Sequence, residues 1–511
     1  MMFHSRQRHA RPMPRLAIGL LPVVAALLAG CPPPPAVTRG PNVLLISIDS
    51  LRADRLGCYG YERPTSPRID ALAEAGALFE SCYSSTSWTL PAHAALFTGL
   101  PDSAHGCDSN ERILAPAQQT LAEVMRSGGW QTIGFWSGPY LHPRFGLSQG
   151  FDRWISCTGY EAYGKKSLAA AREVGVGQAP VGESAANARS HRDVTGPRVT
   201  AAVEEFLRAR EPHAPPFLAF VHLWDVHYDY IPPAEWARPF VDPEYDGPID
   251  GSARSVLAFD GARLSVKDLA QLEGLYDGEI AWTDHHVGLI VDLLDELGLS
   301  RDTLVVVVSD HGEEFFEHGR FGHRQQLHEE SVRVPWILRW PEHVAPGTRV
   351  GGVSSLADVA PTLLELVGLP DELARANGLS HAAALTRAFA PGGPVAEAAP
   401  RVTNGLALSE LELLGGGRRV AARDDRWSVL VDPARERVLA AFDRLADPNE
   451  TRDRIEPGDP PTVPEDAKKL ALDALTLLQR LRELHRTDLP PGAPLPPELE
   501  SELRALGYLA D

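Results

Sequence analysis

Cysteine is scarce in this chain, with 5 residues in 511, and their spacing is not that of a cysteine-based metal site. If Cys31 is set aside for the reason given below, Cys58, Cys82, Cys107 and Cys157 remain. Four cysteines allow three pairings wherever disulfides are permitted. We therefore expect these four residues either to be buried free thiols or to form one or two disulfides.

Basic residues are also few, since 49 Lys and Arg face 68 Asp and Glu, which gives a formal net charge of −19. Nucleic-acid binding that ignores sequence depends on Lys and Arg neutralising phosphates, so this balance argues against it. Hydrophobic residues make up 44% of the chain, enough for a full core. At roughly 100–200 residues per domain, the length predicts one large domain with a smaller appendage.

The N-terminal apolar run, residues 16–28, is short for a membrane-spanning helix, which takes about 20 residues. It follows a basic stretch and ends at Leu28-Ala29-Gly30-Cys31, which resembles a bacterial lipobox. We expect residues 1–30 to be a lipoprotein signal peptide, with an ordinary signal anchor as the alternative. Two acyl chains on Cys31 would hold the protein on a membrane of the cell envelope, on its periplasmic or outer side. The proline-rich residues 31–41 would form a stiff linker.

Strand-like and helix-like patterns alternate from residue 42 to about 368, which indicates βαβ units and a mostly parallel sheet. Strands are predicted at residues 43–48, 130–136, 217–224, 303–309 and 334–340, and helices at 66–79, 199–209 and 275–297, with a capping box at residues 120–123 opening another. Residues 158–196 lack periodicity and are expected to form a surface insertion. We assign residues 42–400 to one α/β domain.

The pattern changes after about residue 400. Residues 418–432 and 437–445 are predicted to be antiparallel strands around a turn at Asp432-Pro433, followed by a helix over residues 465–485 and a last short helix ending at Leu509. Residues 401–511 are therefore predicted to be a small α+β subdomain.

Two of the apolar runs end in side chains that bind metals. Residues 43–48 lead into Asp49, and residues 303–309 lead into Asp310 and His311. Such runs predict strands buried on both faces, and open α/β sheets bind ligands outside the carboxyl ends of their strands. Each Asp alone could equally well cap a turn. Together they predict a metalloenzyme.

Thr89 precedes a short predicted helix in which Pro91 suits the first position and Gly99 suits the end. The free N–H groups and the positive dipole end at a helix N-terminus favour an anionic ligand. A hydroxyl held at a metal beside such a site is how a nucleophile for sulfuryl or phosphoryl transfer is built. A plain threonine cap is the alternative.

These elements, taken in order, closely resemble the sulfatase family of the alkaline-phosphatase superfamily from residue 42 to about 452. The motifs include Asp49-Ser-Leu-Arg-Ala-Asp54, Gly57-Cys-Tyr-Gly60, Trp88-Thr-Leu-Pro-Ala-His93, Gly146-Leu-Ser-Gln-Gly-Phe-Asp152, Ser309-Asp-His-Gly312 and Phe442-Asp-Arg-Leu-Ala-Asp-Pro448. The resemblance implies an α/β, alkaline-phosphatase-like sandwich with a large, mostly parallel sheet and a small C-terminal antiparallel domain.

The resemblance also implies site residues. Asp49, Asp310 and His311 correspond to metal ligands, and Thr89 corresponds to the attacking group on the same ion. The family's second Asp, directly after the first, is here Ser50, so that ligand is weakened or lost.

Further catalytic positions fall on His227 and His323, and His323 stands where sulfatases often carry Lys. His323 could replace that cation or bind a second ion. Asp225 and Asp229 flank His227 and could complete this second metal or substrate site; the alternative is that these side chains are solvated or capping groups.

The nucleophile motif departs from the family. Sulfatases carry Cys or Ser, then x-Pro-x-Arg, and oxidise the first residue to formylglycine. Thr89 should stay an alcohol and form an ester that water must cleave, which works for phosphate and is harder for sulfate. His93 replaces the Arg and removes a fork that clamps oxyanions. His142 and Arg144 are candidate substitutes for a family Lys and His that are not clearly present.

We therefore expect a metal-dependent hydrolase of a sulfate or phosphate ester. An envelope transferase that uses the same Thr89 ester, and a binding lipoprotein with a decayed site, are alternatives. One metal site suits Ca²⁺, Mg²⁺ or Mn²⁺, whereas a second site containing His227 and His323 would favour Zn²⁺ or Mn²⁺. The leaving group is not encoded in a recognisable pattern, for example in residues 158–196 or 232–262.

Overall fold

The computed structural model describes residues 40–158, 195–252, 264–370, 378–387, 405–413, 416–458 and 460–485, with a few positions beside these ranges. The predicted signal peptide, the lipidation site at Cys31, nearly all of the linker, most of the insertion and the end of the last helix lie outside the described residues. Within the described residues, no helix is both long enough and apolar enough to cross a membrane.

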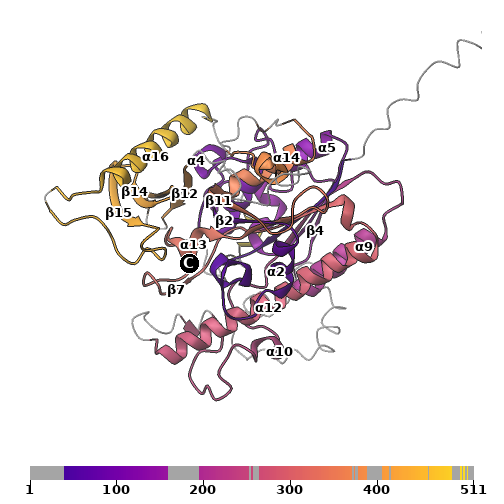
Figure 1. Ribbon diagram of the computed structural model, residues 1–511, viewed down its shortest axis with the longest axis horizontal. Coiled ribbons are helices and arrows are strands. Elements are labelled where there is room, and N and C mark those ends of the chain that lie inside the picture. Colours follow the sequence, from indigo (N-terminus) through magenta and orange to yellow (C-terminus); the bar gives the residue numbers. More distant parts are fainter. Residues whose placement is uncertain are drawn as a thin grey trace, which may run out of the picture. The chain divides into compact units, whose positions relative to one another are not determined.

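A nine-stranded, mostly parallel sheet lies at the centre of the large domain (Figure 1). Its order is β11-β2-β10-β6-β1-β5-β3-β4, with β9 paired to β2. The strands are β1 (Asn42–Ile48), β2 (Ala77–Tyr83), β3 (Gln131–Trp136), β4 (Arg153–Ser156), β5 (Phe217–Leu223), β6 (Thr303–Ser309), β9 (Arg333–Val334), β10 (Trp336–Arg339) and β11 (Thr348–Ser355). The predicted sheet is confirmed, with β10 running antiparallel to both of its neighbours.

Helices cover both faces of this sheet. Along β1, Val43 and Leu45 pack into one hydrophobic cluster, whereas Leu44, Ile46 and Ile48 pack into the other. The first cluster includes residues of α3 (Thr89–Thr98), α5 (Leu121–Ser127) and α14 (Val359–Leu366). The second includes residues of α2 (Pro67–Glu74), α9 (Gly196–Arg208) and α12 (Val266–Glu296). Because successive side chains of a strand point to opposite faces, β1 is buried on both and the domain is a three-layer sandwich.

The register of β1 places the candidate site at the carboxyl ends of the parallel strands. β1 lies between β5 and β6 and is parallel to both, with Ile48 beside Ser309 and Leu223. Asp49 and Asp310 therefore leave neighbouring strands at the same level. The predicted convergence of these two strand ends is confirmed.

An antiparallel sheet and one helix form the C-terminal subdomain. Its strands, in order, are β12 (Ala407–Glu412), β13 (Arg418–Arg423), β14 (Trp427–Asp432) and β15 (Arg437–Asp443). The helix α16 (Glu465–Leu484) packs its apolar side against this sheet. Contacts group residues 40–511 into one compact unit.

Several predicted elements are wrong at their boundaries. The helix predicted over residues 275–297 begins at Val266, and the strand predicted over residues 334–340 is divided at Pro335 between β9 and β10. The helix predicted over residues 66–79 ends at Glu74, and Ala77 begins β2. A Cβ atom at Gly76 would come within 2.1 Å of the Leu338 carbonyl oxygen. The backbone at Gly76 therefore already packs against the sheet, although the spacing of the apolar residues around it still fits a helix. The strand predicted over residues 418–432 is two strands, because the Asp424 carboxylate accepts backbone N–H bonds from Arg426 (2.8 Å) and Trp427 (2.6 Å) in a turn.

The four cysteines of the described part of the chain, Cys58, Cys82, Cys107 and Cys157, are free thiols. Cys58 is half-buried and the other three are buried. The sequence left open whether these residues would be free thiols or form disulfides, and in the structure they are free thiols.

A buried ionic network joins the C-terminal sheet to residues 318–330 of the large domain. The Arg423 guanidinium, from β13, donates to Glu450 Oε1 (3.0 Å), the Leu327 carbonyl oxygen (2.6 Å) and Glu329 Oε1 (3.3 Å). His328 Nδ1 contacts the other oxygen of Glu450 at 2.7 Å. Arg423 and Glu450 are buried, so the pair is shielded from solvent.

Replacing Arg423 with Met should lower the free energy of unfolding by about 3–5 kcal/mol, because the substitution leaves the buried Glu450 without its guanidinium partner and removes the closer of the two Arg side chains beside Glu329. Urea denaturation followed by circular dichroism measures this change. Arg435→Met is the matched control: this Arg is 75% exposed, pairs with Asp432 at 2.7 Å, and should contribute little. Equal effects of the two substitutions would contradict the role of the network.

His318 should make stability fall as the pH rises. Its ring donates from both nitrogens, to Glu330 Oε1 (2.7 Å) and to the Glu450 carbonyl oxygen (2.9 Å). Burial lowers its pKa, but the hydrogen bond and charge of Glu330 outweigh burial and raise the pKa to about 9. Because this value exceeds the unfolded value of about 6.5, the stabilisation is complete below pH 6.5 and is lost as the pH rises through 9. Urea midpoints between pH 6 and 10 should fall more for the wild type than for His318→Gln, and parallel curves would refute the assignment.

Candidate active site

Asp310 presents one carboxylate oxygen to the centre of the site. Its Oδ1 accepts backbone N–H bonds from Ser50 (3.1 Å) and His311 (2.8 Å). Its Oδ2 is buried and has no hydrogen-bond partner. Burial, together with the charge of Asp49, raises the pKa of Asp310. A buried polar atom without a partner is costly, which is what a ligand atom awaiting a cation would show.

His311 presents a nitrogen lone pair to the same point. Its Nδ1 lies 2.8 Å from the Gly312 carbonyl oxygen, and because a carbonyl can only accept, Nδ1 carries the proton. Nε2 lies 3.5 Å from Asp310 Oδ2 and 3.6 Å from Asp49 Oδ1. Two ligands about 2.1 Å from a tetrahedral ion stand about 3.4 Å apart, so the spacing of Asp49, Asp310 and His311 fits a shared cation.

Thr89 is the first residue of α3, with Trp88 as its N-cap. The helix therefore begins two residues earlier than Pro91, where the sequence placed its start, whereas Gly99 ends it with φ of 68° as predicted. The Thr89 hydroxyl lies 3.4 Å from both Asp49 Oδ2 and His311 Nε2. The structure thus brings the predicted nucleophile to the predicted ligands.

Ser50 supports Asp49 instead of adding a carboxylate. Its hydroxyl donates to Asp49 Oδ1 at 2.9 Å, and its backbone has φ of 57°. The hydroxyl of Tyr276, on α12, donates to the Ser50 carbonyl oxygen at 2.7 Å. These bonds hold the turn that follows β1.

His93 lies one helical turn after Thr89 and is fully buried. Its Nδ1 donates to the Thr89 carbonyl oxygen (2.8 Å), and its Nε2 accepts from the Ser47 hydroxyl (3.0 Å). Burial, reinforced by His222, lowers its pKa to about 3. His93 is therefore a neutral ring and does not replace the positive charge of an Arg.

His227 and His323 lie next to this group. Their ring centroids are 4.9 Å apart, and the His323 centroid is 4.5 Å from that of His311. His227 Nδ1 donates to the Tyr228 carbonyl oxygen at 2.6 Å, and His323 Nδ1 contacts Glu313 Oε1 at 2.9 Å. Burial lowers the pKa of both rings well below the usual value.

The predicted second metal site is less complete. Asp225 accepts a 2.6 Å hydrogen bond from Thr195, next to the start of α9, and burial raises its pKa. In the described part of the chain, the sets of three acidic, His or Cys ligands close enough to share an ion are Asp49-Asp310-His311 and His93-His222-Asp310. A second site built from Asp225, Asp229, His227 and His323 stays a prediction.

His142 and Arg144 follow β3. His142 Nδ1 accepts the Arg144 backbone N–H at 3.2 Å, and the His142 ring lies 5.9 Å from that of Trp136. Their predicted substitution for the family Lys and His stays a prediction.

Two further residues of the site were not predicted. His222, on β5, places Nε2 3.4 Å from Asp49 Oδ2, and Glu313 contacts His323. The signal for His222 was a single His within the apolar run of residues 217–223, near the carboxyl end of the strand.

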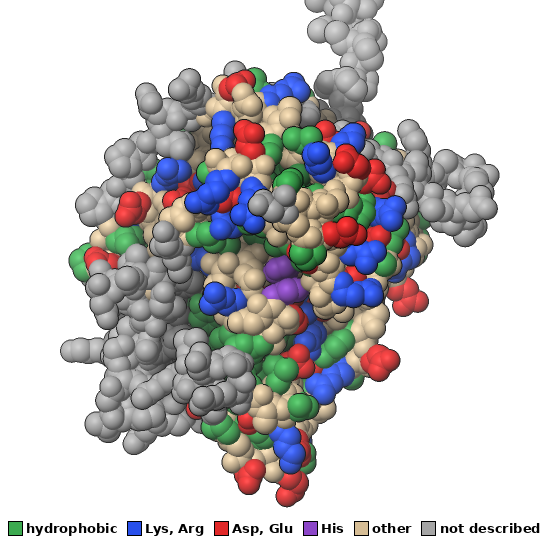
Figure 2. Space-filling model, turned by 90° about the vertical axis from the view of Figure 1, so that its left-hand side faces the viewer, with side chains coloured by type: hydrophobic (Ala, Val, Ile, Leu, Met, Phe, Trp, Pro, Cys, Tyr) green, Lys and Arg blue, Asp and Glu red, His purple; other side chains and the backbone are tan. Residues whose placement is uncertain are grey.

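Histidine side chains are visible in a hollow on the face of the molecule drawn in Figure 2. The exposed fractions of His227 and His323 are only 4% and 6%, so little of either ring contacts solvent.

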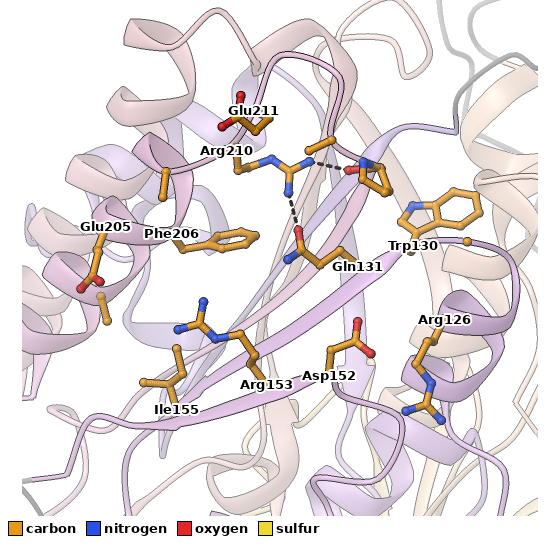
Figure 3. A pocket seen from close by; sticks show the side chains of 15 residues that line it. Arg126, Trp130, Gln131, Asp152, Arg153, Ile155, Glu205, Phe206, Arg210 and Glu211 are labelled. Carbon is orange, nitrogen blue, oxygen red and sulfur yellow. Dashed lines mark hydrogen bonds between the residues drawn. The ribbon is translucent and has the colours of Figure 1, made fainter.

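A cavity of about 810 Å³ lies elsewhere (Figure 3). Its lining includes Gln131, Arg153 and Pro215, at or just before the amino ends of β3, β4 and β5. Asp49 and Asp310 follow the carboxyl ends of their strands. This cavity lies at the amino ends of the strands, on the opposite side of the sheet, and is therefore not the active site.

Comparison with known proteins agrees with this geometry. The sulfatase family model matches residues 41–369. Mouse steryl-sulfatase is 26% identical over 70% of this chain and 67% of its own length, and N-acetylglucosamine-6-O-sulfatase of Bacteroides thetaiotaomicron is 24% identical over 68% and 72%. The crystal structure of the phosphonate monoester hydrolase of Agrobacterium radiobacter covers 87% of this chain and 96% of its own, with a TM-score of 0.66 and 24% identity. The chain belongs to the sulfatase family and is an ester hydrolase.

Proposed function

We propose that this protein cleaves a phosphate or sulfate ester with the Thr89 hydroxyl as nucleophile and a divalent metal as cofactor. The observation that carries the proposal is the position of Thr89 Oγ1, 3.4 Å from both Asp49 Oδ2 and His311 Nε2. Thr89 also stands at the N-terminus of α3, where the helix dipole favours the negative charge of the transferred group.

The ligand set supports the metal. Asp49, Asp310 and His311 would hold the ion, since Asp310 Oδ2 lacks a partner and His311 Nε2 carries a lone pair. A bound ion supplies a lower pKa for a coordinated hydroxyl and neutralises charge on the transferred group. Ser50 and the backbone N–H of His311 keep the two carboxylates oriented.

The chemistry of threonine favours phosphate over sulfate. Attack by Thr89 Oγ1 on phosphorus or sulfur forms a bond to that atom and breaks the bond to the leaving group, which takes up a proton. Water must then attack the same atom and release Thr89 as an alcohol. Formylglycine hydrate has a second hydroxyl that can expel sulfate, and Thr89 has none. Named relatives include sulfatases and a phosphonate monoester hydrolase, so both ester classes belong in the test.

Thr89→Ala should lower turnover about 10³-fold or more, as removal of a nucleophile does. Matched aryl phosphate, aryl phosphodiester and aryl sulfate substrates measure the activity. Thr89→Ser keeps a hydroxyl and is the control that should retain turnover. Undiminished turnover in Thr89→Ala would exclude the covalent mechanism.

Mass spectrometry after acid quenching should find phosphate or sulfate on Thr89 of the wild type. Release of this group by water identifies a hydrolase. An ester that persists in water and is discharged only by an added alcohol would identify the transferase instead.

Asp310→Asn should lose bound metal and turnover together, because Asp310 Oδ2, which has no hydrogen-bond partner, is the oxygen that would bind the ion. Elemental analysis after dialysis gives the metal content. Asp225→Asn is the matched control and should keep the metal content of the wild type if Asp225 serves only Thr195 and the start of α9. Loss of one metal equivalent in that control would establish the second site instead.

A further inference from the structure

Arg324 is a buried arginine without a counter-ion. In the described part of the chain the buried arginines are Arg52, Arg55, Arg324 and Arg423, and the exposed fraction of Arg324 is 9%. Each of the other three forms ion pairs with two carboxylates. Arg324 forms no ion pair with the described residues. Because a charge taken out of water is costly unless an opposite charge compensates it, this guanidinium is matched to an anion that the described residues do not supply.

The contacts that the Arg324 side chain does make are with neutral groups. Its guanidinium lies over the Trp88 ring, with Cζ 3.8 Å from the ring centroid. One terminal nitrogen, Nη1, donates to the Tyr140 hydroxyl (3.0 Å) and to Asn110 Oδ1 (3.1 Å). Nε is buried and has no hydrogen-bond partner. The aromatic ring and the two neutral acceptors orient the guanidinium and offset part of its desolvation, but they do not neutralise its charge.

The backbone conformation at Arg324 also disfavours a side chain. Its φ is 64°, in the left-handed region that favours glycine. Its N–H donates to the Ser87 carbonyl oxygen at 2.9 Å, which ties this turn to the segment before α3. Costly conformations of this kind cluster at functional sites. Backbone and burial thus both oppose an arginine at this position, and a task for its side chain would explain why one is there.

Arg324 stands beside the candidate active site. The residue before it, His323, has its ring centroid 4.5 Å from that of His311. The ring under its guanidinium belongs to Trp88, which directly precedes Thr89. Basic side chains also lie around the hollow in which the histidines are visible in Figure 2. The hydrogen bonds of the Arg324 side chain go to residues outside the metal-ligand set, so the guanidinium lies next to the metal centre and not at it.

We propose that Arg324 binds a second anionic group of the substrate, an oxyanion such as a carboxylate or a sulfate that the leaving group carries. The inference rests on the proposed function, in which the ion and the N-terminus of α3 bind the group that is transferred. A guanidinium recognises an oxyanion through two parallel hydrogen bonds. Nε and Nη2 form the edge of the Arg324 guanidinium that has no acceptor among the described residues, and this edge suits such a pair.

Binding of matched inhibitors tests the proposal without turnover. Phenylphosphonate and benzenesulfonate contain no ester bond, and each is compared with isomers that carry a carboxylate or a sulfonate at the ortho, meta or para position. Isothermal titration calorimetry on the metal-loaded, full-length protein gives the affinities. At least one isomer should bind the wild type about 10–100-fold more tightly than its parent compound, as expected for hydrogen bonds between charged groups.

Arg324→Gln should abolish this preference. Arg324→Lys should restore part of it, because Lys keeps the charge but lacks the planar fork. Arg320→Gln is the matched control, since it removes the same charge from an exposed position close by in the chain and should keep the preference of the wild type. If Arg324→Gln does not fold, Arg324→Lys decides, through a preference between that of the wild type and none.

Three results would overturn the assignment. The wild type could bind no isomer more tightly than its parent, or Arg324→Gln could keep the full preference. Arg324→Gln could also weaken parent and isomer equally, which would place Arg324 on the transferred group. A wild type that binds a parent compound but gains nothing from the second anionic group would refute this inference alone. A wild type that binds neither parent would refute the oxyanion site of the proposed function, and this inference with it.

Discussion

Two carboxylates buried side by side at the ends of β1 and β6 are the constraint on which the site depends. Asp49 and Asp310 are 1% and 0% exposed, and two negative charges so far from water cost several kcal/mol each unless a cation compensates them. The donors around them are the hydroxyls of Ser50 and Thr89 and the backbone N–H groups of Ser50 and His311. None of these brings a formal charge. The cation of the proposed function would compensate the pair.

The rest of the fold holds this unfavourable arrangement in place. The Ser309 hydroxyl donates to the His311 carbonyl oxygen (2.7 Å) and accepts the Leu51 N–H (3.0 Å), which ties the two strand ends together. Arg52 donates to the Glu313 carbonyl oxygen at 3.0 Å, and the Glu313 side chain contacts His323. The chain that carries His323 then runs into the ionic network of the C-terminal sheet, through His328 and Glu450. The small subdomain therefore helps to fix one wall of the active site.

The sequence predicted that Asp49, Asp310 and His311 would lie together, because these residues directly follow the ends of two apolar strands and open α/β sheets bind ligands outside the carboxyl ends of their strands. It missed β2, because Ala77 and its neighbours continue the spacing of the preceding helix and only their place between β10 and β11 makes them a strand. It missed His222 for a related reason. The link of His222 to Asp49 exists only through the pairing of β5 with β1, which no pattern within one strand reveals.

The two departures from the family's nucleophile motif are consistent with each other. His93 lies in an aromatic surround, with ring centroids 5.8 Å from Phe220 and 5.1 Å from His222, and the Ser47 and Thr89 oxygens occupy both of its nitrogens. An Arg there would place a permanent charge in a fully buried space that holds only a neutral ring, at a high desolvation cost. On the proposed function, the negative charge of the transferred group would instead be balanced by the ion and by the N-terminus of α3. Thr89, as an unmodified alcohol, would need the same ion for its own activation. The absence of an Arg at position 93 and of a formylglycine precursor at position 89 would therefore place the same demand on one cation.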